Sequence, residues 1–332
     1  MNVVSILQNK KFQKIARIGV AVLLLWILFL KISVREVLHL LFSLHPLYFS
    51  LAIGLNIVIV ILCTYRWQLL LIAREMKIPF TTALSYYFIG IFFNNFLPTT
   101  VGGDIIRATY TARALEKKKA DALASVLVER VVAVGAMVAV AIVGMIIIYS
   151  KIKNPLFLSI IILVTALFII LYFIILDRRV FEKVKHPVNR IKFFNLGSKL
   201  VSLYESMTLF KTYKRATLYL FLLSLLVQIC FPLVCFALAH SLGFHVPVVY
   251  FFVYIPIISI VSMAPISINA VGLREASFVL LFTSIGVLKE QALGLSLLFY
   301  ITTILVSLMG GILFLVGHHK KEEIPVEIRE EL

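Results

Sequence analysis

The chain has 332 residues, of which 61% are hydrophobic and only 14% are charged, with a formal net charge of +16. A soluble domain carries about 25% charged residues, so this composition excludes an ordinary soluble protein and indicates a membrane protein. The basic balance is typical of loops beside membrane spans and of contact with anionic lipid, and we expect no nucleic-acid partner. The three cysteines show no CxxC spacing, and no metal, nucleotide or hydrolase motif occurs, so we expect no metal and no cofactor.

Apolar runs long enough to cross a bilayer recur along the whole chain. A hydrocarbon core of about 30 Å needs about 20 residues of helix. We therefore expect an all-α membrane domain over residues 1–319, followed by a charged cytosolic tail over 320–332. Six runs qualify as full spans: 15–33, 45–65, 122–149, 155–176, 216–240 and 291–316.

Two shorter apolar runs end in breaks that contain proline and glycine. Each break is followed by a second stretch with helical character, so each segment is expected to form a broken helix. The first consists of a run at 86–96, a break at 97–104 and a helix at 105–114, and the second of a run at 250–263, a break at 264–272 and a helix at 273–282.

The distribution of lysine and arginine decides whether the broken segments cross the membrane. If both termini are cytosolic and each broken segment returns to the side it entered from, most of the 32 basic residues fall on the cytosolic side, Arg66 and Arg107 among them. A full crossing would place the basic stretch 107–119 and the basic loop 177–215 outside, against the positive-inside rule. We therefore predict six full spans plus two re-entrant broken helices, one entering from each side.

The two broken segments share a spacing. Pro98 precedes Arg107 by nine residues, Pro265 precedes Arg274 by nine, and the pattern returns after 167 residues. Since the two copies enter from opposite sides in this topology, they form an inverted repeat. Inverted repeats with broken helices at corresponding positions point to the substrate site of a transporter.

The second helix of each broken segment is expected to begin inside the membrane. Asp104 and Asn269 are suitable N-cap residues for these helices, and the free N–H groups at a helix start favour an anion. Arg107 and Arg274 lie in the first turns, where a guanidinium can bind phosphate through two parallel hydrogen bonds. We predict a phosphate site on this basis. The alternative is two proline-kinked helices whose arginines reach the membrane surface.

Acidic residues accompany these arginines. Glu129 falls inside an apolar span, where a charge is costly unless it is paired or hydrated, and we expect it to pair with Arg107 or Arg130. Glu129 and Glu275 either neutralise neighbouring arginines or help to bind a headgroup that carries both a phosphate and an amine. The candidate substrate-binding residues are Asn95, Gly102, Gly103, Asp104, Arg107, Glu129, Arg130, Asn269, Gly272, Arg274 and Glu275, and no catalytic residue is assigned.

An ordered set of motifs covers nearly the whole chain: Arg66-Trp67, residues 95–98 with Gly102-Gly103-Asp104 and Arg107, Glu129-Arg130, and Pro265 with Gly272-Leu273-Arg274-Glu275. In this order they resemble the transmembrane region of lysylphosphatidylglycerol synthases. This region is the flippase-like half of the bacterial multiple peptide resistance factor and also occurs as a stand-alone membrane protein. Members of the family commonly have more glycine in the second motif, where this chain has Ile268, Asn269 and Ala270.

The resemblance implies lipid translocation, with a membrane phospholipid such as aminoacylated phosphatidylglycerol as substrate and a separate lipid synthase as a candidate partner. The full-length factor carries a soluble domain that uses aminoacyl-tRNA, and the residues after the last apolar run leave no room for it. We therefore expect that the chain is not itself the phosphatidylglycerol lysyltransferase. A membrane-embedded or partner-dependent lipid-modifying enzyme and a lipid-binding scaffold that moves nothing remain alternatives, and the oligomeric state stays open.

Overall fold

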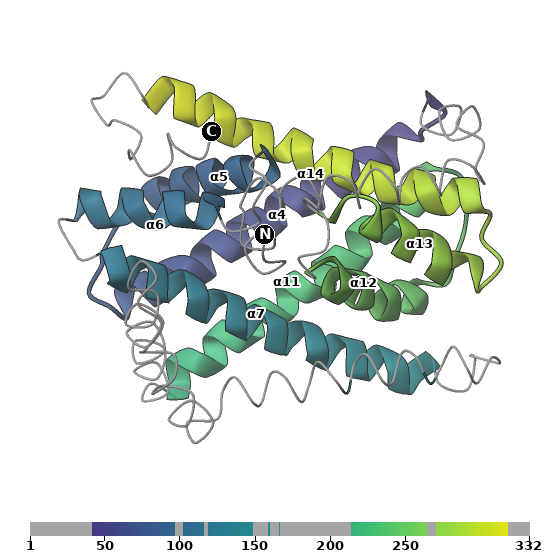
Figure 1. Ribbon diagram of the computed structural model, residues 1–332, viewed down its shortest axis with the longest axis horizontal. Coiled ribbons are helices and arrows are strands. Elements are labelled where there is room, and N and C mark those ends of the chain that lie inside the picture. Colours follow the sequence, from purple (N-terminus) through teal and green to yellow (C-terminus); the bar gives the residue numbers. More distant parts are fainter. Residues whose placement is uncertain are drawn as a thin grey trace, which may run out of the picture. The chain divides into compact units, whose positions relative to one another are not determined.

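The computed structural model describes residues 42–96, 102–115, 119–148, 214–263 and 270–317, together with Ser159 and Ala166 (Figure 1). All elements in these ranges are α-helices. In chain order they are α4 (Pro46–Ile72), α5 (Phe80–Phe96), α6 (Gly102–Ala114), α7 (Lys119–Ile148), α11 (Lys214–Ser241), α12 (Val248–Ser262), α13 (Leu273–Thr283) and α14 (Lys289–Gly317).

Four of these helices, α4, α7, α11 and α14, are long and apolar enough to cross a membrane. α4 alone has 27 residues and is therefore about 40 Å long. Large apolar side chains remain exposed on these helices, for example Ile146 at 73% and Leu315 at 69%, as expected of surfaces that lipid covers. The four helices correspond to four of the six predicted spans. The other two runs, 15–33 and 155–176, lie outside the described residues apart from Ser159 and Ala166.

The predicted span at 45–65 ends too early. α4 continues to Ile72, because the apolar residues 69–72 extend the helix beyond Arg66. Arg66 and Arg107, two of the basic residues expected on the cytosolic side, are both buried in helices. Their charges are compensated by ion pairs inside the protein and not by solvent.

The chain divides into two compact units. The first unit contains Met1–Asn56 and Phe231–Ile304, and the second unit contains Ile57–Cys230 and Leu305–Leu332. The divisions fall within α4, α11 and α14. Each unit contains one broken segment, α12 with α13 in the first and α5 with α6 in the second.

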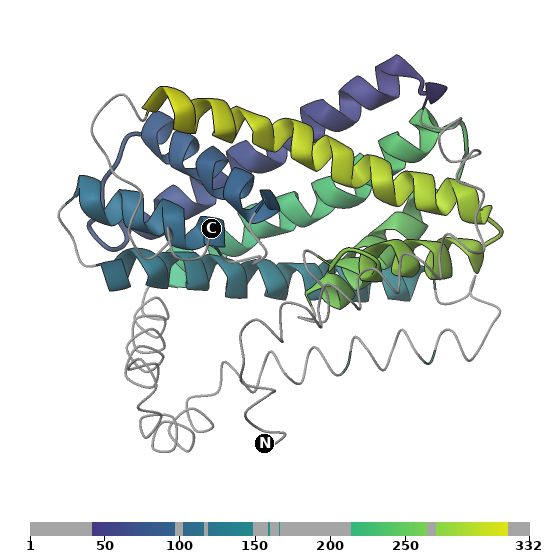
Figure 2. The same cartoon turned by 45° about the horizontal axis from the view of Figure 1, so that its top comes forward.

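In the second unit, α5 and α6 form an antiparallel hairpin and lie side by side in both views (Figure 1, Figure 2). Close to the break, the side chain of Asn94 meets Gly103, whereas farther from it the rings of Tyr86 and Tyr110 lie 5.4 Å apart. The helices can approach because neither has a side chain at the crossing. A Cβ atom on Gly103 would overlap the carbonyl oxygen of Gly90. Small residues permit this type of backbone contact between membrane helices.

Trp67 is at the centre of the packing that joins α4, α6 and α7. It is fully buried and belongs to one hydrophobic cluster with Ala108 of α6 and with Ala122 and Val126 of α7. Its indole N–H donates a hydrogen bond of 3.1 Å to the hydroxyl of Ser125. This packing fixes the rotation of α4 and α7, and so determines where the adjacent Arg66 and the nearby Glu129 point.

In the first unit, α12 and α13 pack on each other and lie side by side in both views (Figure 1, Figure 2). The ring of Phe282 lies 5.2 Å from Phe251 and 5.4 Å from Tyr254. α13 begins directly after Gly272, which has a φ of 83°, a conformation that glycine adopts without strain. Both predicted broken segments are thus present as pairs of helices.

Candidate functional site

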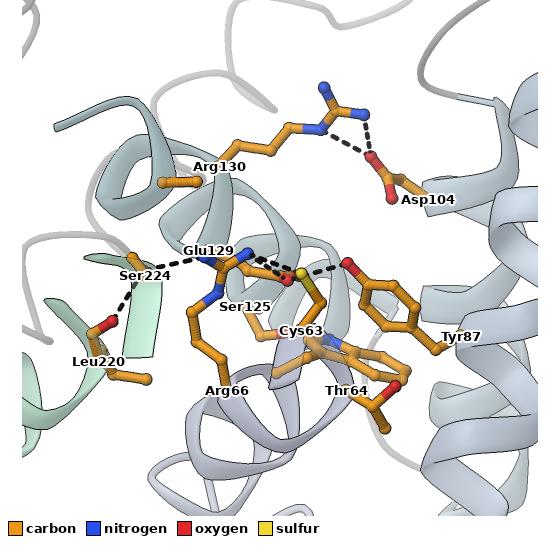
Figure 3. A network of polar contacts seen from close by, with 12 residues as sticks. Cys63, Thr64, Arg66, Tyr87, Asp104, Ser125, Glu129, Arg130, Leu220 and Ser224 are labelled. Atoms are coloured by element: carbon orange, nitrogen blue, oxygen red, sulfur yellow. Dashed lines mark hydrogen bonds and ion pairs between the residues drawn. The ribbon is translucent and has the colours of Figure 1, made fainter. Parts of the chain in front are cut away.

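Five charged side chains of the second unit form a single cluster, the ion-pair network: Arg66 of α4, Asp104 and Arg107 of α6, and Glu129 and Arg130 of α7. Figure 3 shows four of them, Arg66, Asp104, Glu129 and Arg130. Helices far apart in the sequence therefore contribute to one site. Each of its two carboxylates binds two arginines.

Glu129 is the buried centre of the network. Arg66 donates a hydrogen bond of 2.8 Å from Nη2 to Oε1, and Nη2 of Arg107 lies 2.7 Å from Oε2. The Glu129 side chain is only 2% exposed. An ion pair so deeply buried is tolerated only with close geometry and additional hydrogen bonds. The predicted pairing of Glu129 with Arg107 is confirmed, whereas the pairing with Arg66 was not predicted.

Asp104 is the second carboxylate and lies between two arginines. Arg107 donates from Nε to Oδ1 at 3.0 Å. Arg130 donates from Nε to Oδ2 at 2.6 Å (Figure 3). In both arginines Nη2 forms an ion pair with the same oxygen as Nε. Of the two partners considered for Glu129, the structure thus shows Arg107, while Arg130 binds Asp104. Glu129 and Arg130 are adjacent on α7 but point in different directions, so they reach different partners on α6.

Each of the helices α6 and α7 contributes one carboxylate and one arginine to the two ion pairs between them. Glu129 and Arg130 are adjacent on α7, and their partners Arg107 and Asp104 lie one helical turn apart on α6. One carboxylate–arginine pair therefore points from α7 to α6 and the other from α6 to α7. These two ion pairs join the broken helix to a long apolar helix.

Aromatic rings enclose the guanidinium of Arg107. Its central carbon lies 4.8 Å from the ring centroid of Trp67 and 4.5 Å from that of Tyr87, within the range of cation–π attraction. The hydroxyl of Tyr87 also donates a hydrogen bond of 3.2 Å to Oε1 of Glu129. Within the described part of the chain, Nη1 of Arg107 is a buried donor with no hydrogen-bond partner.

Arg66 connects the network to α11. Its Nη1 donates a hydrogen bond of 2.9 Å to the hydroxyl of Ser224, which in turn donates to the carbonyl oxygen of Leu220 at 2.7 Å (Figure 3). The sequence contained a signal for Arg66, because an arginine within an apolar run that continues to Ile72 needs an internal partner. No sequence pattern identified Ser224 or Tyr87.

The start of α6 differs from the prediction. Asp104 is the third residue of this helix and not its N-cap, since α6 begins at Gly102. The N–H of Gly103 instead donates a hydrogen bond of 2.8 Å to Oδ1 of Asn94, a side chain of α5. Asp104 is thereby free to bind arginines. The predicted site contained the adjacent Asn95, which lies in the last turn of α5.

The second broken segment has its own arginine and carboxylate in the first unit. Arg274 donates to Oε1 of Glu275 from Nη2 at 2.5 Å and from Nε at 3.1 Å. The N–H of Gly272 donates to Oε2 of Glu275 at 2.6 Å, and the Arg274 guanidinium lies 4.2 Å from the ring centroid of Tyr300. Glu275 thus neutralises Arg274, one of the two roles considered for it. Asn269, the other predicted N-cap, lies outside the described residues.

Comparisons with known proteins cover most of the chain. The family model of the lysylphosphatidylglycerol synthase TM region matches residues 14–311. A UPF0104 membrane protein of Methanothermobacter thermautotrophicus is 24% identical over 336 residues, which cover 92% of this chain and 94% of that protein. No solved structure matches the chain.

Proposed function

The chain belongs to the family of the lysylphosphatidylglycerol synthase transmembrane region, and we propose that it is a flippase-like translocase for a phosphate-bearing membrane lipid. Aminoacylated phosphatidylglycerol is one candidate substrate. The membrane class follows from the family and from four helices with the length and composition of spans. The translocase activity is our inference from the chemistry of the site.

The observation that carries the proposal is the burial of the ion-pair network among apolar helices. Ionisable side chains within membrane helices are costly, and by default they mark a pathway for an ion or a polar substrate. Arginine binds phosphate through parallel hydrogen bonds, and carboxylates bind amines. A network of three arginines and two carboxylates therefore has the groups needed for a headgroup with a phosphate and an amine.

The hairpin of α5 and α6 supports a re-entrant arrangement. Two antiparallel helices of 17 and 13 residues return the chain to the side from which it came. We propose that this hairpin enters from the cytosolic side, with both termini in the cytosol, and that α12 and α13 enter from the opposite side. The start of α6 then lies within the membrane, where its N–H groups and the neighbouring arginines favour an anion.

The second broken segment repeats the chemistry of the first. Arg274 has a carboxylate partner in Glu275 and an aromatic ring in Tyr300, as Arg107 has Asp104, Glu129 and two aromatic rings. This likeness supports the proposal that the two segments are copies in an inverted repeat, each with an arginine that can bind a phosphate.

Reconstitution into liposomes tests the proposal. Vesicles with the purified protein would contain trace fluorescent phosphatidylglycerol, phosphatidylethanolamine or glucosylceramide, which lacks phosphate, and a membrane-impermeant quencher would report the outer leaflet. We expect the protein to expose the inner-leaflet pool of the phosphate-bearing lipids faster than that of glucosylceramide. Quenching no faster than in protein-free vesicles would contradict translocation. A chemical change of the lipid in mass spectra would indicate an enzyme instead, and binding alone a scaffold.

A further inference from the structure

Asp104 occupies a place between two arginines that also suits a phosphate. We propose that a phosphodiester anion binds between Arg107 and Arg130 by replacing the Asp104 carboxylate that these residues hold in this structure. The inference rests on the proposed function and identifies the contact that the lipid phosphate makes first. The shared chemistry is that of a phosphate anion, whether it belongs to a lipid headgroup or is free in solution.

The geometry of Asp104 is the first argument. Its Oδ1 binds Nε and Nη2 of Arg107. Its Oδ2 binds Nε and Nη2 of Arg130 (Figure 3). Two guanidinium groups thus approach two oxygens of one anion. A phosphodiester likewise carries one negative charge and two unesterified oxygens. Replacement of the carboxylate would therefore keep both the charge balance of the site and the number of hydrogen bonds to the arginines.

An unpartnered donor is the second and independent argument. Nη1 of Arg107 is buried, and no described residue accepts a hydrogen bond from it. The residue as a whole is only 4% exposed. A buried donor without an acceptor is costly, about 1–3 kcal/mol for a neutral group and more for a charged one. A phosphodiester has two ester oxygens besides its two unesterified ones, so it carries more acceptor atoms than the carboxylate that it would replace.

Access is the third argument. The Arg130 side chain is 38% exposed, whereas those of Arg107 and Glu129 are 4% and 2% exposed. A ligand therefore reaches the network at the ion pair between Arg130 and Asp104. The ion pair between Glu129 and Arg107 would persist during the exchange. The helices α6 and α7 would therefore stay joined while the side chain of Asp104 moves away.

Binding to the detergent-solubilised full chain tests this site separately from transport. The probe is dioctanoyl phosphatidylglycerol, measured by calorimetry beside dioctanoylglycerol, which has no phosphate, and beside inorganic phosphate. Removing the competing carboxylate with Asp104→Asn should tighten phosphatidylglycerol binding by at least about tenfold, or about 1.4 kcal/mol. Arg130→Gln should abolish it. Asp121→Asn is the matched control, since Asp121 also pairs α7 with an arginine, Arg74, at 3.6 Å, and it should leave the affinity unchanged.

A measurement on the unaltered protein covers the case in which a variant fails to fold. Phenylglyoxal modifies accessible arginines, and peptide mass spectrometry can compare Arg130 with the exposed Arg113. Dioctanoyl phosphatidylglycerol should protect Arg130 and not Arg113, and dioctanoylglycerol should protect neither. Equal affinity of the Asp104→Asn variant and the unaltered protein, or no protection of Arg130, would overturn the proposal.

The arms of the experiment also separate the site from the function. The predicted affinities and protection in a protein that moves no lipid would uphold the site and overturn the translocase. If the protein transports lipid but the Asp104→Asn variant binds phosphatidylglycerol with unchanged affinity, the result would uphold the translocase and overturn the site. If inorganic phosphate protects Arg130 and the lipid does not, the replacement of the Asp104 carboxylate by a phosphate would be upheld, and the ligand of the site would be a soluble anion.

Discussion

Arg66 and Glu129, 63 positions apart in the sequence, form a buried ion pair of 2.8 Å between α4 and α7. Both side chains are at most 5% exposed. Arg107 binds the other oxygen of the same carboxylate. Glu129 therefore joins two buried arginines, Arg66 of α4 and Arg107 of α6, to α7.

Replacing Glu129 by glutamine should destabilise the protein strongly. The change keeps the size of the side chain but leaves Arg66 and Arg107 without this carboxylate, and breaking a buried pair typically costs about 3–5 kcal/mol. The measurement is the thermal unfolding midpoint in detergent. Glu75→Gln is the control, because Glu75 is exposed and should tolerate the loss of charge. Equal unfolding midpoints for the two variants would show that Glu129 has no structural role.

Gly103→Ala should separate α5 from α6. The added Cβ would overlap the carbonyl oxygen of Gly90, a backbone atom that cannot rotate aside, and overpacking of this kind costs about 1–3 kcal/mol. Gly54→Ala is the matched control in α4, where the Cβ would meet no atom within 4 Å. Alanine is favoured over glycine inside helices by about 0.5–1 kcal/mol. The two variants should thus change the unfolding midpoint in opposite directions, and a shared direction would refute the close crossing.

Lysine and glutamine substitutions of Arg107 and Arg274 should both reduce lipid transport. Lysine keeps the charge but loses the parallel hydrogen bonds. A lost hydrogen bond to a charged group is worth about 1.5–3 kcal/mol, and we expect transport to fall roughly tenfold or more. The glutamine variants should transport less than the lysine variants, because the charge is lost too.

The readout for these four variants is movement of fluorescent phosphatidylglycerol in liposomes, with unfolding midpoints recorded on the same samples. A folded variant with reduced transport separates substrate binding from stability. Normal transport by both glutamine variants would show that Arg107 and Arg274 are not needed for lipid transport and have only a structural role.

We predict that residues 104–120 and 177–215 lie on the cytosolic side, as the proposed re-entrant arrangement requires. Single cysteines introduced at Lys118 and Lys192, which lie outside the described residues, should be protected from an impermeant thiol reagent added to intact cells. They should react after the membrane is permeabilised. Labelling of either position from outside would mean that the first broken segment crosses the membrane completely.

Local sequence properties predicted the helices of this protein well. Apolar runs anticipated α4, α7, α11 and α14, and breaks with proline and glycine anticipated the helix pairs α5–α6 and α12–α13. The error at the end of α4 is informative. The predicted span stopped at residue 65, whereas α4 continues past Arg66 to Ile72 and the charge of Arg66 is paired with Glu129 inside the protein.

The sequence by itself determined the class and the elements, since length, apolarity and breaks act within a segment and need no knowledge of its neighbours. It also identified four of the five residues of the ion-pair network. Only the tertiary structure decided how they pair: Glu129 with Arg66 and Arg107, and Asp104 with Arg107 and Arg130. The physical reason is that pairing depends on how each helix is rotated, and the packing of Trp67 and of Gly103 against Gly90 sets that rotation across segments distant in the chain.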